Sequence, residues 1–425
     1  MNTLQDIAAT LQGYDPNALS VPDVLAFLER LVSPVPDTET VGVFDALDRV
    51  LAKDLISPIN VPPHDNSAMD GYAVAGAALQ PGQASAFRCV GTALAGAAWR
   101  GTVGPGDCVK IMTGAIMPPG LDTVVPLEFV SVDSDVVRWA ADVVRPGDNR
   151  RLLGEDLMQG RAALARGQRL GPAALGLIAS LGLAQVPVVR RLRVAYFSTG
   201  DEILSLGEAS REGAVYDSNR YTVFGLLRRM GVDVIDMGVV KDEPQALEAA
   251  FRQAADAADA IITSGGVSMG EADHTKAMMR QLGDVAFWRI AMRPGRPMAV
   301  GRIPGARGPC VLFGLPGNPV AVMVTFLAFV RPALQRMMGS TPSAPVYLQA
   351  RSAEAIRKKP GRTEYQRGLV TPSDDGQLWV RTTGNQGSGV LSSMVQGNGL
   401  IVLHHQQGSV ATGDAVDVMM FDGAI

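Results

Sequence analysis

The sequence is poor in cysteine and carries no excess of positive charge. Its three cysteines, Cys89, Cys108 and Cys310, lie far apart and form no CxxC pair, which argues against a disulfide framework and a zinc ribbon. We therefore expect buried, reduced thiols. The 38 basic side chains against 42 acidic ones give a net charge of −4. A broad basic surface is missing, so we expect no nucleic-acid partner.

Long uninterrupted apolar runs are also missing. Two charge-free segments, 170–189 and 310–330, reach the length of about 20 residues that a membrane-spanning helix needs. Prolines and glycines interrupt the first segment, and GLPGNP lies inside the second. The opening MNTLQDIAAT lacks a basic region followed by an apolar run, so we expect no signal peptide. These features predict a cytoplasmic protein without a membrane span.

The 425 residues suggest about three domains, and the spacing of the apolar residues changes along the chain. We expect helical structure over about 21–55 and over 173–183, whereas 59–144 has short apolar runs split by glycine and proline, as in an inserted β-rich domain. Strands and helices alternate over 193–338, which predicts a mostly parallel sheet covered on both faces. Strand-like runs from residue 345 onward predict a small β-barrel.

Three strands of the alternating region end in small, glycine-containing loops, STGDE at 198–202, TSGG at 263–266 and GLPGNP at 314–319. Ligands of open α/β sheets bind beyond the carboxyl ends of the strands. Glycines let backbone N–H groups approach an anion, and the next helix adds a favourable field. We therefore predict a phosphate-bearing ligand, with simple turn formation as the alternative.

A serine hydrolase is an alternative, because GVSMG at 266–270 matches the GxSxG nucleophile motif. The motif needs a sharp strand-to-helix turn and a later histidine. Here the helix is delayed, His274 is too close in sequence, and only His404 and His405 remain farther along the chain. This hypothesis is the less favoured one.

Carboxylates crowd the same loops and the DNSAMDGYAV segment; they are Asp65, Asp70, Asp201, Glu202, Asp217, Asp242, Glu271 and Asp273. Acidic groups beside an anion repel it unless a hard cation lies between them. Mg²⁺ takes one or two carboxylates together with phosphate oxygens, so it suits this mixture. Helix capping is the alternative for Asp242 and Asp273, which precede helices.

Three arginines, Arg289, Arg293 and Arg296, lie in FWRIAMRPGRPMAVG between two strands of the same domain. Guanidinium groups at these spacings around a Pro-Gly turn could converge on one oxyanion. A solvated basic turn is the alternative.

Together these residues resemble the MoeA family, the molybdopterin molybdenumtransferases, which are also found as the E domain of gephyrin. Nine motifs in the family's order carry the resemblance: DNSAMDGYAV at 65–74, IMTGA at 111–115, RPGDNRRLLGED at 145–156, FSTGDEI at 197–203, YDSN at 216–219, SGGVSMGEADHTK at 264–276, GLPGNPVA at 314–321, EYQRG at 364–368 and GSGVLSSMVQGNGLIVL at 387–403.

The resemblance implies an L-shaped homodimer with its active-site cleft between the subunits. It implies an α/β multidomain chain with a central MogA-like parallel α/β domain, a β-rich insertion, a helical linker and a C-terminal barrel. The boundaries we predict are 1–58 plus 145–190 for the discontinuous helical linker domain, 59–144 for the inserted β-rich domain, 191–338 for the α/β molybdopterin-binding domain and 339–425 for the barrel.

The implied activity is molybdenum insertion in molybdenum cofactor biosynthesis. Such an enzyme binds adenylylated molybdopterin, hydrolyses its link to AMP in the presence of Mg²⁺ and molybdate, and leaves molybdenum on the dithiolene. A molybdopterin adenylyltransferase is the expected upstream donor. That adenylyltransferase activity is also the alternative function, although its glycine loop typically reads GGTG. A scaffold that has lost catalysis is a further alternative.

The site residues that we predict fall into four groups. The catalytic residues are Asp70, Glu202, Asp242 and Asp273, of which the last three also hold the metal. The arginines Arg289, Arg293 and Arg296 face molybdate, at positions where the family often has lysine. His64 departs from the aromatic or aliphatic residue common in the family. The residues that bind the substrate are Thr113, Arg151, Asp156, Thr199, Gly200, Asp201, Ser218, Asn219, Ser264, Gly265, Gly266, Pro316, Gly317, Asn318, Pro319, Arg367 and Ser388.

Overall fold

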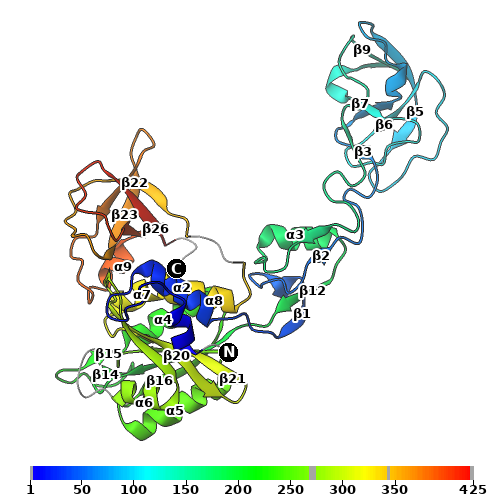
Figure 1. Cartoon of the computed structure of the whole chain (residues 1–425). Helices are drawn as coiled ribbons and strands as arrows, with labels where there is room; N and C mark the ends of the chain where they lie inside the picture. The colour runs from blue at the N-terminus through cyan, green and yellow to red at the C-terminus, as the bar shows by residue number, and fades with distance from the viewer. Residues whose placement is uncertain (1–2, 268–273, 342–344, 422–425) are drawn as a thin grey trace.

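The computed structural model describes residues 3–267, 274–341 and 345–421. The chain is elongated, with a large body at one end, a small β-rich domain at the other and a linker domain between them (Figure 1). The large body consists of the α/β domain and the C-terminal barrel, which lie side by side (Figure 1). The predicted multidomain α/β fold is confirmed.

The α/β domain is built on a six-stranded sheet. Its strand order is β16-β13-β17-β21-β20-β18, and the first four strands run parallel while β20 and β18 are antiparallel to their neighbours. Parallel strands buried on both faces read as continuous apolar runs, as in the sequence of β13. The strands are β13 (Arg193–Thr199), β16 (Asp233–Val240), β17 (Ala260–Ser264), β18 (Asp284–Arg289), β20 (Pro297–Gly305) and β21 (Gly308–Leu315).

Helices cover both faces of this sheet and enclose a separate apolar core on each side. On one face lie α5 (Pro244–Ala257) and α6 (His274–Leu282). The other face carries α4 (Ser218–Arg229), α7 (Pro319–Thr325), a π-helical turn (Phe326–Val330) and α8 (Arg331–Met337). Two short β-segments, β14 (Ile203–Leu204) and β15 (Val215–Tyr216), pair beyond the end of β13.

The first two helices, α1 (Leu4–Ala9) and α2 (Val21–Leu31), pack into the core of the α/β domain and not into the linker domain. Each begins at a capping box, formed by Thr3 with Asp6 and by Ser20 with Asp23. Phe27 of α2 stacks edge-on against Trp288 of β18, with ring centroids 4.9 Å apart. The apolar face of α2 therefore completes a domain whose sheet lies much later in the sequence.

The continuous helical stretch Pro319–Met337 is the one helix of the described residues that is long and apolar enough to cross a membrane. Within its 18-residue apolar window, 78% is buried inside the protein. It packs against the sheet and against α2 and α4, which explains its apolar sequence.

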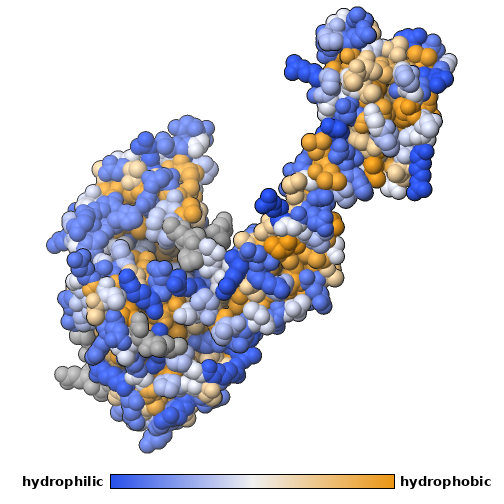
Figure 2. All heavy atoms as spheres, turned by 45° about the vertical axis from the view of Figure 1, so that its right-hand side comes forward, coloured by the Kyte–Doolittle hydropathy of each residue, from blue (hydrophilic) through white to orange (hydrophobic). Residues whose placement is uncertain are grey.

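The linker domain contains more β-structure than the sequence predicts. It has a core of its own around two antiparallel pairs, and the single longer helix in its described residues is α3 (Pro172–Ser180). Apolar side chains gather on its surface (Figure 2), and Phe44 is 97% exposed there. The pairs are β1 (Thr38–Gly42) with β12 (Gln185–Val189) and β2 (Leu55–Ile56) with β11 (Ala162–Leu164), and a 3-10 turn spans Phe44–Ala46.

The β-rich domain is a six-stranded sheet of order β7-β4-β6-β5-β9-β8, joined to the linker through the pair β3–β10. The strands β5 and β6 are parallel within this otherwise antiparallel sheet. The strands are β3 (Asn66–Ser67), β4 (Gly71–Val74), β5 (Ser85–Ala93), β6 (Asp107–Ile111), β7 (Thr123–Pro126), β8 (Ser131–Asp133), β9 (Val136–Trp139) and β10 (Arg150–Arg151), with 3-10 turns at Gly76–Ala78 and Leu127–Phe129.

The C-terminal domain is a closed barrel of five strands, since β23 pairs with both β24 and β25. A sixth strand, β19 (Met292–Arg293), comes from the α/β domain and pairs in parallel with β23. This pairing fixes the barrel beside the arginine turn. The barrel strands are β22 (Leu348–Ser352), β23 (Thr363–Pro372), β24 (Leu378–Thr382), β25 (Gly399–Leu403) and β26 (Ala415–Met420), and α9 (Ser392–Gln396) lies between β24 and β25.

Candidate active site

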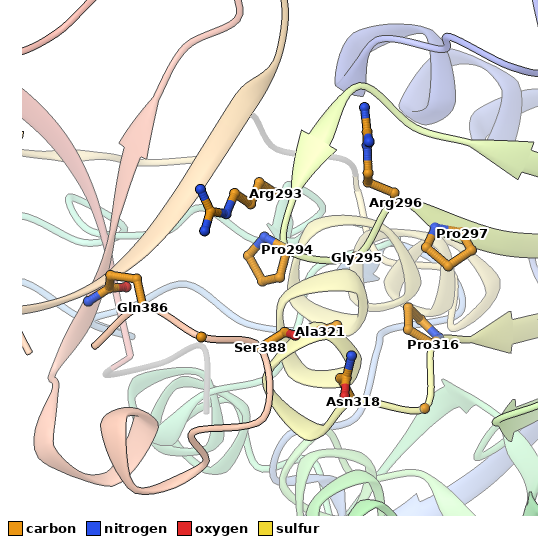
Figure 3. Close-up of a pocket in the computed structure, with 12 residues that line it drawn as sticks. Arg293, Pro294, Gly295, Arg296, Pro297, Pro316, Asn318, Ala321, Gln386 and Ser388 are labelled. Atoms are coloured by element: carbon orange, nitrogen blue, oxygen red, sulfur yellow. The ribbon is translucent and has the colours of Figure 1, made fainter. Parts of the chain in front are cut away.

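A pocket of about 470 Å³ lies where the α/β domain meets the barrel. Three segments that are distant in sequence line it: the turn 293–297, the loop 316–318 with the start of α7, and the barrel segment 386–388 (Figure 3). The predicted residues that line it are Arg293, Arg296, Pro316, Gly317, Asn318 and Ser388. The pocket thus joins part of the arginine group to one glycine loop and to the barrel.

Arg293 and Arg296 leave the turn in different directions. In Figure 3, Arg293 extends toward Gln386 on the barrel side, whereas Arg296 extends away from Ser388. Arg289 does not line the pocket. It ends β18 opposite Pro297, and its backbone N–H donates to the carbonyl of Pro16 at 2.8 Å. The structure therefore separates the three predicted arginines.

Arg367 lies behind the pocket wall and is completely buried. Its Nε donates to Ser393 Oγ at 2.9 Å, and its Nη2 donates to the carbonyls of Gly387 at 3.0 Å and Asn385 at 3.3 Å. Burial, and then the like charge of Arg293, lower the pKa of Arg367 to about 10. No carboxylate of the described residues forms an ion pair with either arginine. Two neighbouring cations without a carboxylate favour a bound anion.

The arginine turn depends on Gly295, which has a φ of +91°. A Cβ at this position would lie 2.4 Å from Thr325 Oγ1, on the buried helix beneath the turn. We expect Gly295→Ala to lower the free energy of unfolding by about 1–3 kcal/mol, because it combines this clash with backbone strain. Denaturant unfolding measures the change.

Gly317→Ala is the matched control for Gly295→Ala. Gly317 lines the same pocket, its φ is not positive, and a Cβ there would meet nothing within 4 Å. Its free energy of unfolding should stay within about 0.5 kcal/mol of the native value. Equal stability of the two variants would show that the turn does not need a glycine at position 295.

The loop 316–318 is tied to the start of α4. Asn219 Nδ2 donates to the carbonyl of Gly317 at 2.8 Å. Asp217 caps α4 by accepting from the N–H of Arg220 at 3.1 Å. The other side-chain oxygens, Asn219 Oδ1 and Asp217 Oδ2, are buried without a hydrogen-bond partner. A ligand or a water molecule could supply the missing hydrogen bonds of these two oxygens. Ser218 beside them is exposed.

The other two glycine loops pack against each other at the carboxyl ends of β13 and β17. Gly265 has a φ of +90°, and a Cβ there would lie 2.4 Å from the carbonyl oxygen of Thr199. Gly266 similarly packs on Thr275, and Gly200 on the Glu202 carboxylate. The glycines therefore allow the close approach of the two loops to each other, which the alternative of simple turn formation also requires.

Ser264, one of the predicted substrate-binding residues, lies in a buried cluster of hydroxyls. Its Oγ lies 2.7 Å from Tyr196 OH and 3.2 Å from Ser198 Oγ. Burial raises the pKa of Tyr196, so its hydroxyl stays protonated. Through these hydrogen bonds, Ser264 at the end of β17 is linked to the neighbouring strand β13.

The predicted metal ligands are only partly described. Asp242 Oδ1 accepts from Thr275 Oγ1 at 3.1 Å, and Thr275 Oγ1 lies 3.4 Å from Thr199 Oγ1. Asp242 does not cap α5, because the N-cap residue is Glu243, without a side-chain hydrogen bond. Glu202 and Asp201 are exposed beyond β13. Asp273 lies outside the described residues. Over 3–267, 274–341 and 345–421, no three acidic, histidine or cysteine side chains are grouped as a metal site.

The remaining predicted residues lie far from the pocket. Asp70 and Thr113 meet in the β-rich domain, where the N–H and Oγ1 of Thr113 both donate to Asp70 Oδ1 at 2.7 Å. These bonds hold the pKa of the Asp70 carboxyl below its usual value. Arg151 on β10 and Asp156 lie where this domain joins the linker, and both are exposed. Within one chain, the predicted set is therefore divided between two ends of the molecule (Figure 1).

Residues outside the predicted set also line the pocket, among them Gln386, Ala321 and Pro294. Gln386 Oε1 accepts from the N–H of Arg367 at 2.8 Å, which holds the barrel segment in place. Gln386 directly precedes the GSGVLSSMVQGNGLIVL motif, and this position in the sequence could have identified it as a pocket residue. Ala321 is the last residue of the GLPGNPVA motif, so its place in that motif was the available signal for it.

Family models match three consecutive parts of the chain. The MoeA N-terminal region (domain I and II) matches residues 19–182, a probable molybdopterin binding domain matches 195–336, and the MoeA C-terminal region (domain IV) matches 349–421. The chain belongs to the MoeA family. The resemblance carried by the nine motifs is thereby confirmed.

Individual MoeA relatives match along nearly the whole length. A protein of Haemophilus influenzae named molybdopterin molybdenumtransferase is 40% identical, over 93% of this chain and 96% of its own. A protein of Bacillus subtilis with the same name is 33% identical, over 90% of each chain. The crystal structure of a molybdopterin biosynthesis MoeA protein from Pyrococcus horikoshii covers 95% of this chain and 100% of its own, with a TM-score of 0.80 and 26% identity.

Proposed function

We propose that this MoeA-family chain is a molybdenum insertase of molybdenum cofactor biosynthesis. In this reaction, adenylylated molybdopterin loses AMP by hydrolysis and receives molybdenum from molybdate on its dithiolene. The observation that carries the proposal is the pocket beside Arg293 and Arg367, two neighbouring cations that no carboxylate of the described residues neutralises. The names of the relatives support the same reaction class.

The residues of the pocket suit an oxyanion such as molybdate. Arginine keeps its proton over the working pH range and offers directed N–H donors. Arg293 supplies them from the α/β side, while Arg367 holds the barrel segment that carries Ser388. The 316–318 loop lines the pocket, Asn219 is bonded to it, and the N–H of Gly265 donates to the carbonyl of Leu315 directly before it at 3.2 Å. We propose that these loops bind the phosphate-bearing part of the substrate.

Mg²⁺ is the cofactor that we propose. Asp242 with the hydroxyls of Thr199 and Thr275 forms an oxygen-rich group at the strand ends, which fits a hard cation that keeps several waters. Glu202 and Asp273 complete the proposed ligand set. The ion would neutralise the charge of the phosphate, and the glycine loops and Asp242 would hold that end of the substrate in place.

We propose further that the working unit is a homodimer. The β-rich domain lies at the end of the chain opposite the pocket (Figure 1). This domain and its junction with the linker carry Asp70, Thr113, Arg151 and Asp156. A second chain could bring its β-rich domain to the pocket of the first, and the exposed apolar surface of the linker domain is available for pairing. A molybdopterin adenylyltransferase is the proposed donor. Because adenylylated substrates are made from intracellular ATP, we propose a cytoplasmic location.

AMP release tests the proposed function. Purified protein supplied with adenylylated molybdopterin, Mg²⁺ and molybdate should release AMP, and chelation of Mg²⁺ or omission of molybdate should slow the release by roughly ten-fold or more. Molybdenum bound to the pterin product is measured in parallel. Release that is independent of molybdate would contradict the insertase function and leave a simple hydrolase. Pyrophosphate formation from ATP and free molybdopterin would instead indicate the adenylyltransferase.

A further inference from the structure

Two of the three cysteines stand side by side in the β-rich domain. Cys89 on β5 and Cys108 on β6 are direct partners across parallel strands. Both side chains join the same apolar core, which includes Tyr72, Phe87 and Trp139. Adjacent strands lie about 4.8 Å apart, and disulfides join Cα atoms that are roughly 4.4–6.8 Å apart. The backbone spacing therefore suits a disulfide.

The two thiols differ in their access to solvent. Cys108 is fully buried, whereas Cys89 is half-buried. The Cys89 Sγ–H donates to the carbonyl oxygen of Gly91 at 3.4 Å, and the two thiols are close enough for Cys89 to affect the pKa of Cys108. Burial, and then the proximity of Cys89, raise the pKa of Cys108 to about 12. Cys89 is therefore the thiol that a small oxidant meets first.

The strand β5 can adjust at this point. Its register with β6 shifts between Cys89 and Thr92, directly after the cysteine pair. Irregular pairing of this kind leaves the strand locally bent and less constrained than a regular ladder. The sulfur atoms can thus approach each other without displacement of the regular part of the sheet.

We propose that Cys89 and Cys108 form a redox-modification site that closes to an intramolecular disulfide when the protein meets hydrogen peroxide. The peroxide oxidises the Cys89 sulfur to a sulfenic acid and releases one water. The Cys108 sulfur then attacks the Cys89 sulfur, and the displaced hydroxyl leaves with the Cys108 proton as a second water. Two electrons pass from the two thiols to the peroxide, and one S–S bond forms. The proposal does not depend on the proposed function.

The site lies on the strand that leads to the Asp70–Thr113 contact. β6 ends at Ile111, two residues before Thr113, and β4 beside it begins directly after Asp70. A covalent link between β5 and β6 would restrict the strand that carries Thr113. The unfolding midpoint of the β-rich domain should rise on oxidation, by on the order of 10–20 °C.

Alkylation of the denatured full-length protein tests the proposal. The native protein is treated with or without hydrogen peroxide, and is then denatured and alkylated. Without oxidant, all three cysteines should react with the alkylating reagent. After hydrogen peroxide, only Cys310 should react, and mass spectrometry should find a peptide pair that links Cys89 to Cys108 and separates on treatment with dithiothreitol. Cys310→Ser is the matched control and should still form the link, whereas Cys89→Ser and Cys108→Ser should each abolish it.

Other results would overturn the proposal. Three reactive cysteines after peroxide treatment would show that the pair does not oxidise. Irreversible oxidation of Cys89 with Cys108 still free would show that the second sulfur does not reach the first. A link between two chains would place the reactive sulfurs at a surface. The wild-type measurement decides among these outcomes, whether or not the variants fold.

Discussion

Replacement of Arg293 by alanine is expected to raise the molybdate concentration that half-saturates AMP release by roughly 10- to 150-fold. Arg293 lines the pocket next to the buried Arg367. A charge-assisted hydrogen bond contributes about 1.5–3 kcal/mol, which corresponds to this range. AMP release measured against molybdate concentration gives the value. The affinity for adenylylated molybdopterin, measured separately, should change much less if the glycine loops hold its phosphate, as we propose.

Arg289→Ala is the matched control for Arg293→Ala. It removes the same charge from the same region, but Arg289 does not line the pocket. Its molybdate dependence should stay close to that of the native protein. Unchanged molybdate dependence in both variants would show that neither arginine binds molybdate and that both belong to a solvated basic turn. If Arg293→Ala instead binds the pterin substrate more weakly and keeps a normal molybdate dependence, Arg293 binds the pterin substrate and not molybdate.

The sequence predicts the layers of this fold well, because local periodicity reflects local burial. Alternating apolar runs and amphipathic helices over 193–338 correspond to the β13–α8 region, with both faces of the sheet covered. The position of α1 and α2 was not predictable in the same way. Their apolar faces show that they pack against something, but not which domain receives them.

The candidate site is harder to predict, because it depends on contacts between distant segments. Strand ends identified the glycine loops, yet sequence alone did not show that Ser264 is buried beneath them or that Arg367 lies behind the pocket wall. The pairing of β19 with β23 brings the arginine turn to the barrel. Likewise, Cys89 and Cys108 look unrelated in sequence and become neighbours through strand register.

A mixture of an Asp70→Ala variant and an Asp242→Ala variant is expected to recover about a quarter of the native active sites, although each variant alone is nearly inactive. The reason is geometric, since the β-rich domain that carries Asp70 and the α/β domain that carries Asp242 lie at opposite ends of one chain (Figure 1). If each site takes Asp70 from one subunit and Asp242 from the other, a mixed dimer has one site with both residues intact. Random exchange makes half of the dimers mixed, and each contributes one of its two sites.

The recovered activity must depend on subunit exchange. The two variants are mixed after brief dissociation, and AMP release is compared with that of each variant treated alone. A chain that carries both substitutions, mixed with native chains, is the control. Each site of such a mixed dimer lacks either Asp70 or Asp242 if the sites are composite, so this mixture should show only the activity of its native dimers. Failure of the two single variants to complement, or full activity of a protein that sediments as a monomer, would contradict a site built from two subunits.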